Sequence, residues 1–204
     1  MKKAVSLFLV ILLAFSLSTA FAKRLDYQLA SGKIADYEDF KARFIRILSD
    51  ENRSIDWPSK PYKEDGYEVY DVMTAQMDDG TVDIAVYTKN GNVEYIVITG
   101  SVYDEGNNMD WLLDNARDAC FTTFGILYIN DYQSGGDHTP EGIADEANNE
   151  WNKLLLGLSE DHGDMIAYAT DVLGFPTGIW MYEDGSTTML YIYVLNKNSR
   201  LWAE

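Results

Sequence analysis

The chain has 204 residues, with 16 Lys and Arg against 33 Asp and Glu, so its formal net charge is −17 at pH 7. Nucleic-acid affinity comes mainly from basic side chains that neutralise phosphates, so this charge excludes nucleic acid as an expected partner. The single cysteine, Cys120, excludes an intramolecular disulfide and leaves the core to hold the fold.

The N-terminus has the pattern of a secretory signal peptide. Two lysines precede an apolar run over residues 4–15, and residues 20–22 read Ala-Phe-Ala, which is the small-residue pattern of a leader-peptidase site. The apolar run is shorter than the roughly 20 residues needed to span a membrane. We therefore interpret residues 1–22 as a signal peptide that is cleaved after Ala22 and leaves no membrane anchor.

Cleavage would leave residues 23–204 as a single domain with 14 basic and 33 acidic residues, a net charge of −19. The short two-lysine start is typical of bacterial export. We expect a protein that is secreted, extracellular or held in the cell envelope of a bacterium, where a high net charge favours solubility.

The first expected element is a helix over residues 35–48, because apolar side chains recur there at intervals of three and four. Asp36 is placed to cap its N-terminus. Residues 50–65 contain two prolines and are expected to form a loop in which Trp57 and Tyr62 are exposed.

Three strands are expected next, over residues 67–75, 81–89 and 92–102, because the apolar period changes there to two. Asn90-Gly91 predicts a type I′ hairpin turn between the last two strands, since both residues tolerate a positive φ.

The turn also predicts a register for this hairpin. Pairing Lys89 with Asn92 through an uninterrupted ladder places Val86 opposite Tyr95 on an apolar face. Ile96 then lies on the other face, which we expect to be partly solvated.

Two longer helices follow in the predicted order. An apolar stripe from Met109 to Leu127 includes Cys120, which we assign to the core as a small hydrophobic residue. After a Gly-rich loop over residues 133–138, Thr139-Pro140 predicts the start of a helix that runs to Leu158.

The last strands are expected over residues 165–172, 177–183 and 186–195, with Asp184-Gly185 as a second tight turn. The predicted fold class is therefore α+β, an antiparallel sheet of about six strands with helices packed on one face.

The pattern of one helix followed by three strands occurs twice, over residues 35–102 and 107–195. We interpret it as two divergent units within the one domain. This element order, with turns at Asn90-Gly91 and Asp184-Gly185, resembles the beta-lactamase inhibitor protein family and secreted, unassigned C-terminal domains of Gram-positive surface proteins. A type III chaperone-like αβ fold shares some of the order.

The resemblance covers most of residues 35–195 and implies helices on an antiparallel sheet. It includes no diagnostic motif, so no site residue is carried over. The chain departs from the inhibitors in lacking their disulfides, which leaves inhibition unsupported here.

Candidate groups for catalysis or metal binding are few. Asp131, Asp137 and Glu141 near His138 are weak candidates for calcium ligands, although their spacing matches no calcium-binding loop. Both His138 and His162 are expected to be solvated loop residues. We expect no cofactor, no metal and no enzymatic activity.

Aromatic residues are abundant, with five Trp and 14 Tyr. Such side chains anchor interfaces because they bring a large rigid area and a polar group. We expect Trp57, Tyr62 and Tyr132 to lie in loops, free to meet a partner. Those assigned instead to the sheet and core are Tyr87, Tyr95, Trp151, Trp180, Tyr191 and Tyr193.

The expected function is non-enzymatic binding, with another protein as the expected partner at an exposed sheet face or loop surface. One alternative is a small-ligand or carbohydrate receptor, which needs a deep pocket between helices and sheet. The second alternative is an extracellular hydrolase, which needs carboxylates or His138 to converge in a cleft.

Overall fold

The computed structural model describes residues 32–49, 55–103, 108–158 and 165–199, with the side chains of residues 165–168 left out. Within this part of the chain there are three α-helices: α3 (Tyr37–Ser49), α4 (Met109–Gln133) and α5 (Ile143–Leu158). The strands are β1 (Ala35–Asp36), β2 (Tyr62–Glu64), β3 (Tyr67–Met77), β4 (Gly80–Lys89), β5 (Asn92–Tyr103), β6 (Met165–Val172), β7 (Phe175–Asp184) and β8 (Thr187–Leu195).

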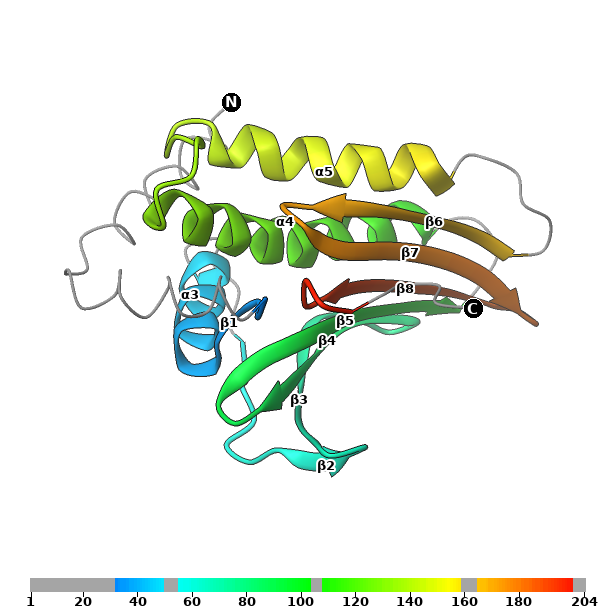
Figure 1. Cartoon of the computed structure of the whole chain (residues 1–204). Coiled ribbons are helices and arrows are strands. Elements are labelled where there is room, and N and C mark those ends of the chain that lie inside the picture. Colours follow the sequence, from blue (N-terminus) through cyan, green and yellow to red (C-terminus); the bar gives the residue numbers. More distant parts are fainter. Residues whose placement is uncertain (1–31, 50–54, 104–107, 159–164, 200–204) are drawn as a thin grey trace.

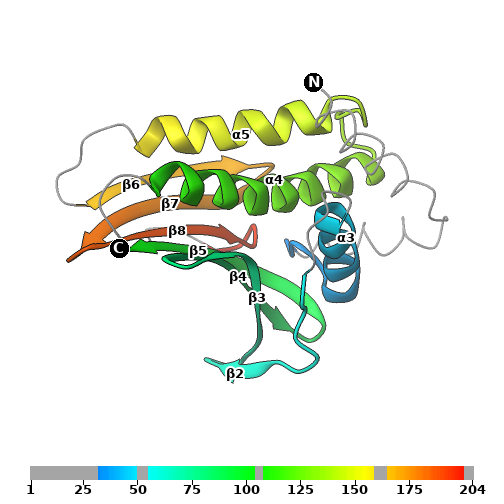
Figure 2. The ribbon, with the colours of Figure 1, turned by 180° about the vertical axis from the view of Figure 1, so that it is seen from behind.

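The strands form one antiparallel sheet in the order β2-β3-β4-β5-β8-β7-β6, and β1 pairs with the start of β5. The helices α4 and α5 lie side by side across one face of this sheet, and α3 stands near one end of α4 (Figure 1). The view from behind shows that β3 and β2 curl away from the helices (Figure 2). The predicted α+β class, with helices packed on an antiparallel sheet, is confirmed.

The core lies between the helices and the sheet. The apolar stripe of α4 is buried there and includes Leu112, Cys120 and Phe124, none of which is exposed to solvent. The assignment of Cys120 to the core is confirmed. Burial raises the pKa of its thiol, so the thiolate that would act as a nucleophile is disfavoured.

Two local signals in the sequence work as predicted. The carboxylate of Asp36 accepts a hydrogen bond of 3.2 Å from the backbone N–H of Glu38, which caps α3. Asn90 and Gly91 have φ of 54° and 76°, and Lys89 pairs with Asn92 across the resulting turn.

The register beyond this turn differs from the prediction. Tyr87 pairs with Tyr95, because Glu94 is an extra residue on β5 that has no partner on β4. Such a β-bulge shifts the rest of the ladder by one residue and places neighbouring side chains of the bulged strand on the same face.

The bulge changes which face each residue of β5 occupies. Val86 pairs with Ile96, so the expected Val86–Tyr95 pair does not form. Ile96 and Ile98 are fully buried in the core instead of lying on a partly solvated face. Tyr95 turns to the face away from the helices.

Other boundaries also shift. Residues 62–64 form the edge strand β2, where a loop is expected, and Asp65-Gly66 supplies the turn into β3. The helix α5 begins at Ile143 rather than at Pro140, because residues 139–142 first form a turn closed by a hydrogen bond from Gly142 N–H to the Thr139 carbonyl.

The strands β3-β4-β5 and β8-β7-β6 occupy the two halves of the sheet and meet at the β5–β8 ladder. This is the arrangement that two helix-plus-three-strand units would produce. Their divergence from a common unit stays a hypothesis.

Two glycine-to-alanine substitutions, one in the hairpin turn and one inside a helix, test the backbone conformation of the turn. Gly91→Ala is expected to destabilise the protein by roughly 1–2 kcal/mol, because φ of 76° is strained for a residue with a Cβ. Gly125→Ala, inside α4 where a Cβ meets no other atom, is expected to stabilise by roughly 0.5–1 kcal/mol. Urea unfolding measures both, and equal effects of the two substitutions would contradict this assignment of the turn.

Candidate functional site

The sheet has an open face, which is the side turned away from the helices. Side chains alternate between the two faces along each strand, and residues that pair across strands lie on the same face. Starting from Tyr95, the strand pairing therefore identifies the open-face residues of each neighbouring strand. We call the aromatic residues on this side the aromatic face: Tyr62, Tyr67, Tyr87, Tyr95, Trp180, Tyr182, Tyr191 and Tyr193.

The first part of the aromatic face lies on β3, β4 and β5. The rings of Tyr87 and Tyr95 are stacked, with centroids 4.0 Å apart and planes inclined by 17°. Tyr67 meets both rings edge-on, at 5.1 Å from Tyr95 and 6.2 Å from Tyr87. All three rings are half-buried. The stack exists because the bulge places Tyr95 directly opposite Tyr87.

The second part lies on β7 and β8. Trp180 stacks on Tyr193, with ring centroids 4.1 Å apart and planes inclined by 15°. Tyr191 is 6.4 Å from each of these rings and 6.0 Å from Tyr182. These four side chains are also half-buried, so they offer area to solvent while holding one another in place.

Aliphatic residues fill the space between these rings. Val97 pairs with Ala85 on one side and with Tyr193 on the other. Val69, which pairs with both Tyr62 and Tyr87, is fully buried although it is not part of the core beneath the helices. The open face is therefore a packed surface with an apolar floor.

Carboxylates accompany the aromatic rings. The Tyr87 hydroxyl donates to Glu64 Oε2 at 3.0 Å, and the Tyr62 hydroxyl donates to Asp71 Oδ1 at 3.4 Å. Asp83 is half-buried on β4, and its pKa is raised, mainly by burial and to a lesser extent by the charge of Asp71, while a hydrogen bond with Thr81 opposes the rise.

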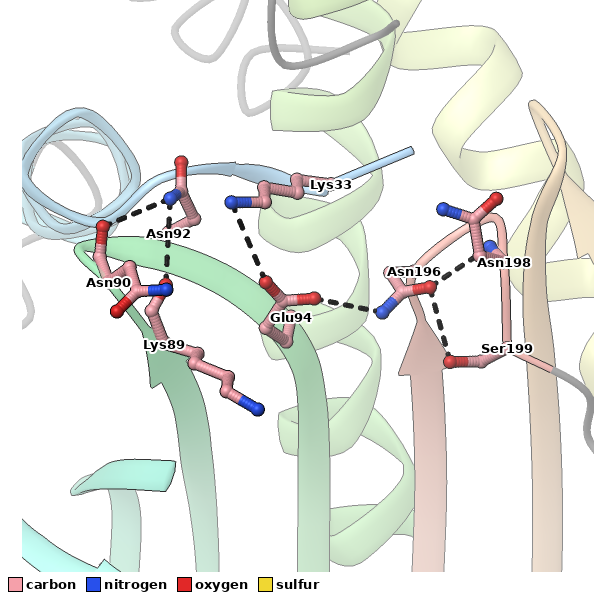
Figure 3. Close-up of polar contacts among 8 residues, drawn as sticks. All are labelled: Lys33, Lys89, Asn90, Asn92, Glu94, Asn196, Asn198 and Ser199. Atoms are coloured by element: carbon pink, nitrogen blue, oxygen red, sulfur yellow. Dashed lines mark hydrogen bonds and ion pairs between the residues drawn. The ribbon is translucent and has the colours of Figure 1, made fainter. Parts of the chain in front are cut away.

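A polar network holds the bulge in place (Figure 3). Glu94 receives a hydrogen bond of 2.9 Å from Asn196 Nδ2 on its Oε2 and lies 3.8 Å from Lys33 Nζ through its Oε1. The Asn196 side chain in turn accepts from the Asn198 backbone N–H at 2.9 Å and the Ser199 hydroxyl at 3.2 Å. The end of β8 and the segment before β1 are thus joined through the bulged residue.

The three aromatic residues expected to be free for a partner lie in three different parts of the structure. Trp57 is only 9% exposed, and its indole N–H donates to the Tyr37 hydroxyl at 2.9 Å, so that expectation is wrong: its ring packs in the core against Phe44. Tyr132 is 37% exposed but belongs to the last turn of α4, in the helix layer. Tyr62, at 46% exposed, lies on the open face.

The acidic residues near His138 do not gather around a common point. Nowhere in the described ranges do three or more His, Cys, Asp or Glu side chains form a group that could hold a metal ion, so Asp131, Asp137 and Glu141 make no cage there. His138 Nε2 lies 3.6 Å from Asp131 Oδ2, and its ring meets Tyr128 edge-on. His162 lies outside the described residues.

Most of the aromatic face was assigned to sheet and core from the sequence. The sheet assignment holds, but among those six residues only Trp151 is buried in the core. A usable signal is the alternation Trp180-Met181-Tyr182 and Tyr191-Ile192-Tyr193, which places aromatic side chains on one face and aliphatic ones on the other.

Comparison of the chain with protein-family models, with curated proteins and with solved structures finds no match. In the part of the chain that the structure describes, no helix is both long enough and apolar enough to cross a membrane.

The tyrosine stack gives the protein a pH dependence. Burial, assisted by Tyr67 and Glu64, raises the pKa of Tyr95 above its ordinary value of 10.0. The stabilisation is complete below pH 10 and is lost as the pH rises further, because the unfolded phenol ionises first. We expect Tyr95→Phe to reduce this alkaline loss by a few tenths to about 1 kcal/mol, since solvent screens the exposed part of the ring.

Urea unfolding at about pH 8 and about pH 11 measures this difference. Tyr103→Phe is the matched control, because its ring is 59% exposed at the end of β5. An unchanged alkaline loss in Tyr95→Phe would contradict the burial of that phenol.

Proposed function

We propose that this chain is a secreted, non-enzymatic domain that binds another protein through the open face of its sheet. The observation that carries the proposal is the aromatic face, in which Trp180 and several tyrosines are half-buried on a side that no described helix covers. Tyrosine and tryptophan dominate the energetics of protein interfaces, because they bring a large contact area at a small cost in conformational entropy.

The arrangement of the rings favours a protein over a carbohydrate as the ligand. A sugar stacks on the flat face of an aromatic ring, but the stacked pairs Tyr87–Tyr95 and Trp180–Tyr193 already use one face of each ring. The stacking leaves less flat ring area for a sugar, and the open face combines these rings with aliphatic residues and carboxylates. Such a surface suits the mixed polar and apolar side chains of a protein interface.

The hydrolase alternative has no histidine of the described residues on this face to act as a general base. His138 is held between Asp131 and Tyr128 in the helix layer, away from the carboxylates of β3 and β4. The serine nearest to His138 in the sequence is Ser134, and its hydroxyl donates to the Asn130 carbonyl at 2.7 Å, at the end of α4. Binding is the function that these contacts support best.

A photo-cross-linking experiment tests the proposal. The photoreactive residue p-benzoylphenylalanine replaces Met73, which is 47% exposed on the open face, or Leu156, which is 69% exposed on α5. Each protein is irradiated with the culture supernatant and envelope fraction of the producing bacterium. We expect a discrete protein adduct at position 73 and none at position 156.

Competition assigns the adduct to the open face. An excess of the unlabelled natural chain should suppress the adduct at least about tenfold more effectively than the Trp180→Ala chain, because loss of an aromatic hot-spot residue costs about 2 kcal/mol or more. No adduct at position 73, or the same adduct at position 156, would contradict the proposal. An adduct that contains only glycan would favour the carbohydrate receptor.

A further inference from the structure

The strands that form the open face carry acidic but few basic side chains. Lys63 and Lys89 are the only basic residues within strands β1 to β8. The acidic residues in the same strands are Asp36, Glu64, Glu68, Asp71, Asp83, Glu94, Asp171, Glu183 and Asp184. Of these residues, strand alternation places Glu64, Asp71, Asp83, Asp171 and Asp184 on the open face. These carboxylates give the face a negative potential, which selects for a partner of opposite charge.

Two of these carboxylates lie close together on the β3–β4 part of the open face. Asp71 on β3 and Asp83 on β4 occupy adjacent rungs, since Asp71 pairs with Ala85 and Met73 pairs with Asp83. The charge of Asp71 disfavours ionisation of Asp83. No Lys or Arg among the described residues forms an ion pair with either carboxylate.

The aromatic face already binds one ammonium group of this chain. Lys89 Nζ lies 5.6 Å from the centroid of the Tyr67 ring, within the range of a cation–π contact. Tyr62, whose hydroxyl donates to Asp71, places a further ring beside that carboxylate. A lysine or arginine from outside would therefore meet both a negative charge and an aromatic ring here.

A second copy of this chain cannot supply the positive charge that this negatively charged face selects. Each chain has a net charge of −17, and two open faces would bring carboxylates against carboxylates. From these observations we infer that the open face receives a basic segment of its protein partner, with a Lys or Arg side chain of that segment against the Tyr62 ring and the Asp71 and Asp83 carboxylates. This inference rests on the proposed protein-binding function and names the chemistry of the partner.

Charge-neutral variants test the inference. The double variant Asp71→Asn and Asp83→Asn keeps the shape of both side chains, and its control is Asp56→Asn with Asp137→Asn, which removes two exposed charges elsewhere. The probe is a short alternating Gly-Arg peptide, with a Gly-Glu peptide of equal length as its counterpart. Calorimetry at low and at high salt measures the affinity, and circular dichroism verifies that each variant is folded.

We expect the natural chain to bind the Gly-Arg peptide at low salt and the Gly-Glu peptide not at all. The Asp71 and Asp83 double variant should bind the Gly-Arg peptide about tenfold more weakly, and the control variant within about twofold of the natural chain. Equal weakening in both variants, or no binding by the natural chain, would overturn the inference.

The same variants separate this inference from the function on which it rests. If the adduct at position 73 forms equally well in the Asp71 and Asp83 double variant, the inference of a basic segment is wrong, while the proposal of protein binding at the open face stands. If no adduct forms at position 73 in any chain, the proposed function fails. A salt-sensitive adduct that weakens only in this double variant supports both.

Discussion

The β-bulge at Glu94 is the constraint on which the open face depends. Without the extra residue, the ladder from the Asn90-Gly91 turn would place Tyr95 in the core opposite Val86. The bulge instead places Tyr95 opposite Tyr87 and lets Ile96 enter the core. One unpaired residue thus decides at once which side chains fill the interior and which aromatic rings meet solvent. The contacts of Glu94 with Lys33 and Asn196 stabilise this bulged register.

The two faces of the sheet are stabilised in different ways. On the helix face, fully buried aliphatic and aromatic residues pack against α3, α4 and α5, and this burial supplies most of the folding free energy. On the open face, stacked rings lie beside the buried Val69 and Val97 and are themselves only half-buried. Because the hydroxyls of Tyr87 and Tyr62 are hydrogen-bonded to Glu64 and Asp71, these rings are already ordered in the free chain, which would lower the entropic cost of the proposed binding.

Much of the fold could be predicted from local signals in the sequence. Asp36 caps a helix, Asn90-Gly91 forms the predicted turn, and the stripe containing Cys120 faces the core, because each depends on near neighbours in the chain. The bulge could not be predicted, since a period of two is counted without knowing where one strand gains a residue. Trp57 was misplaced for a related reason: its burial comes from Tyr37 and Phe44, which are distant in sequence. The aromatic face is therefore a product of register and tertiary packing.

The central claim is that Tyr95 faces Tyr87 on the open side of the sheet. Nuclear Overhauser contacts measured by NMR on the purified chain test it directly, because the two ring centroids lie 4.0 Å apart. The account predicts strong contacts between the ring protons of Tyr87 and Tyr95, together with contacts between Ile96 and Val86. Contacts from the Tyr95 ring to the Val86 methyl groups, with none to Tyr87, would contradict it.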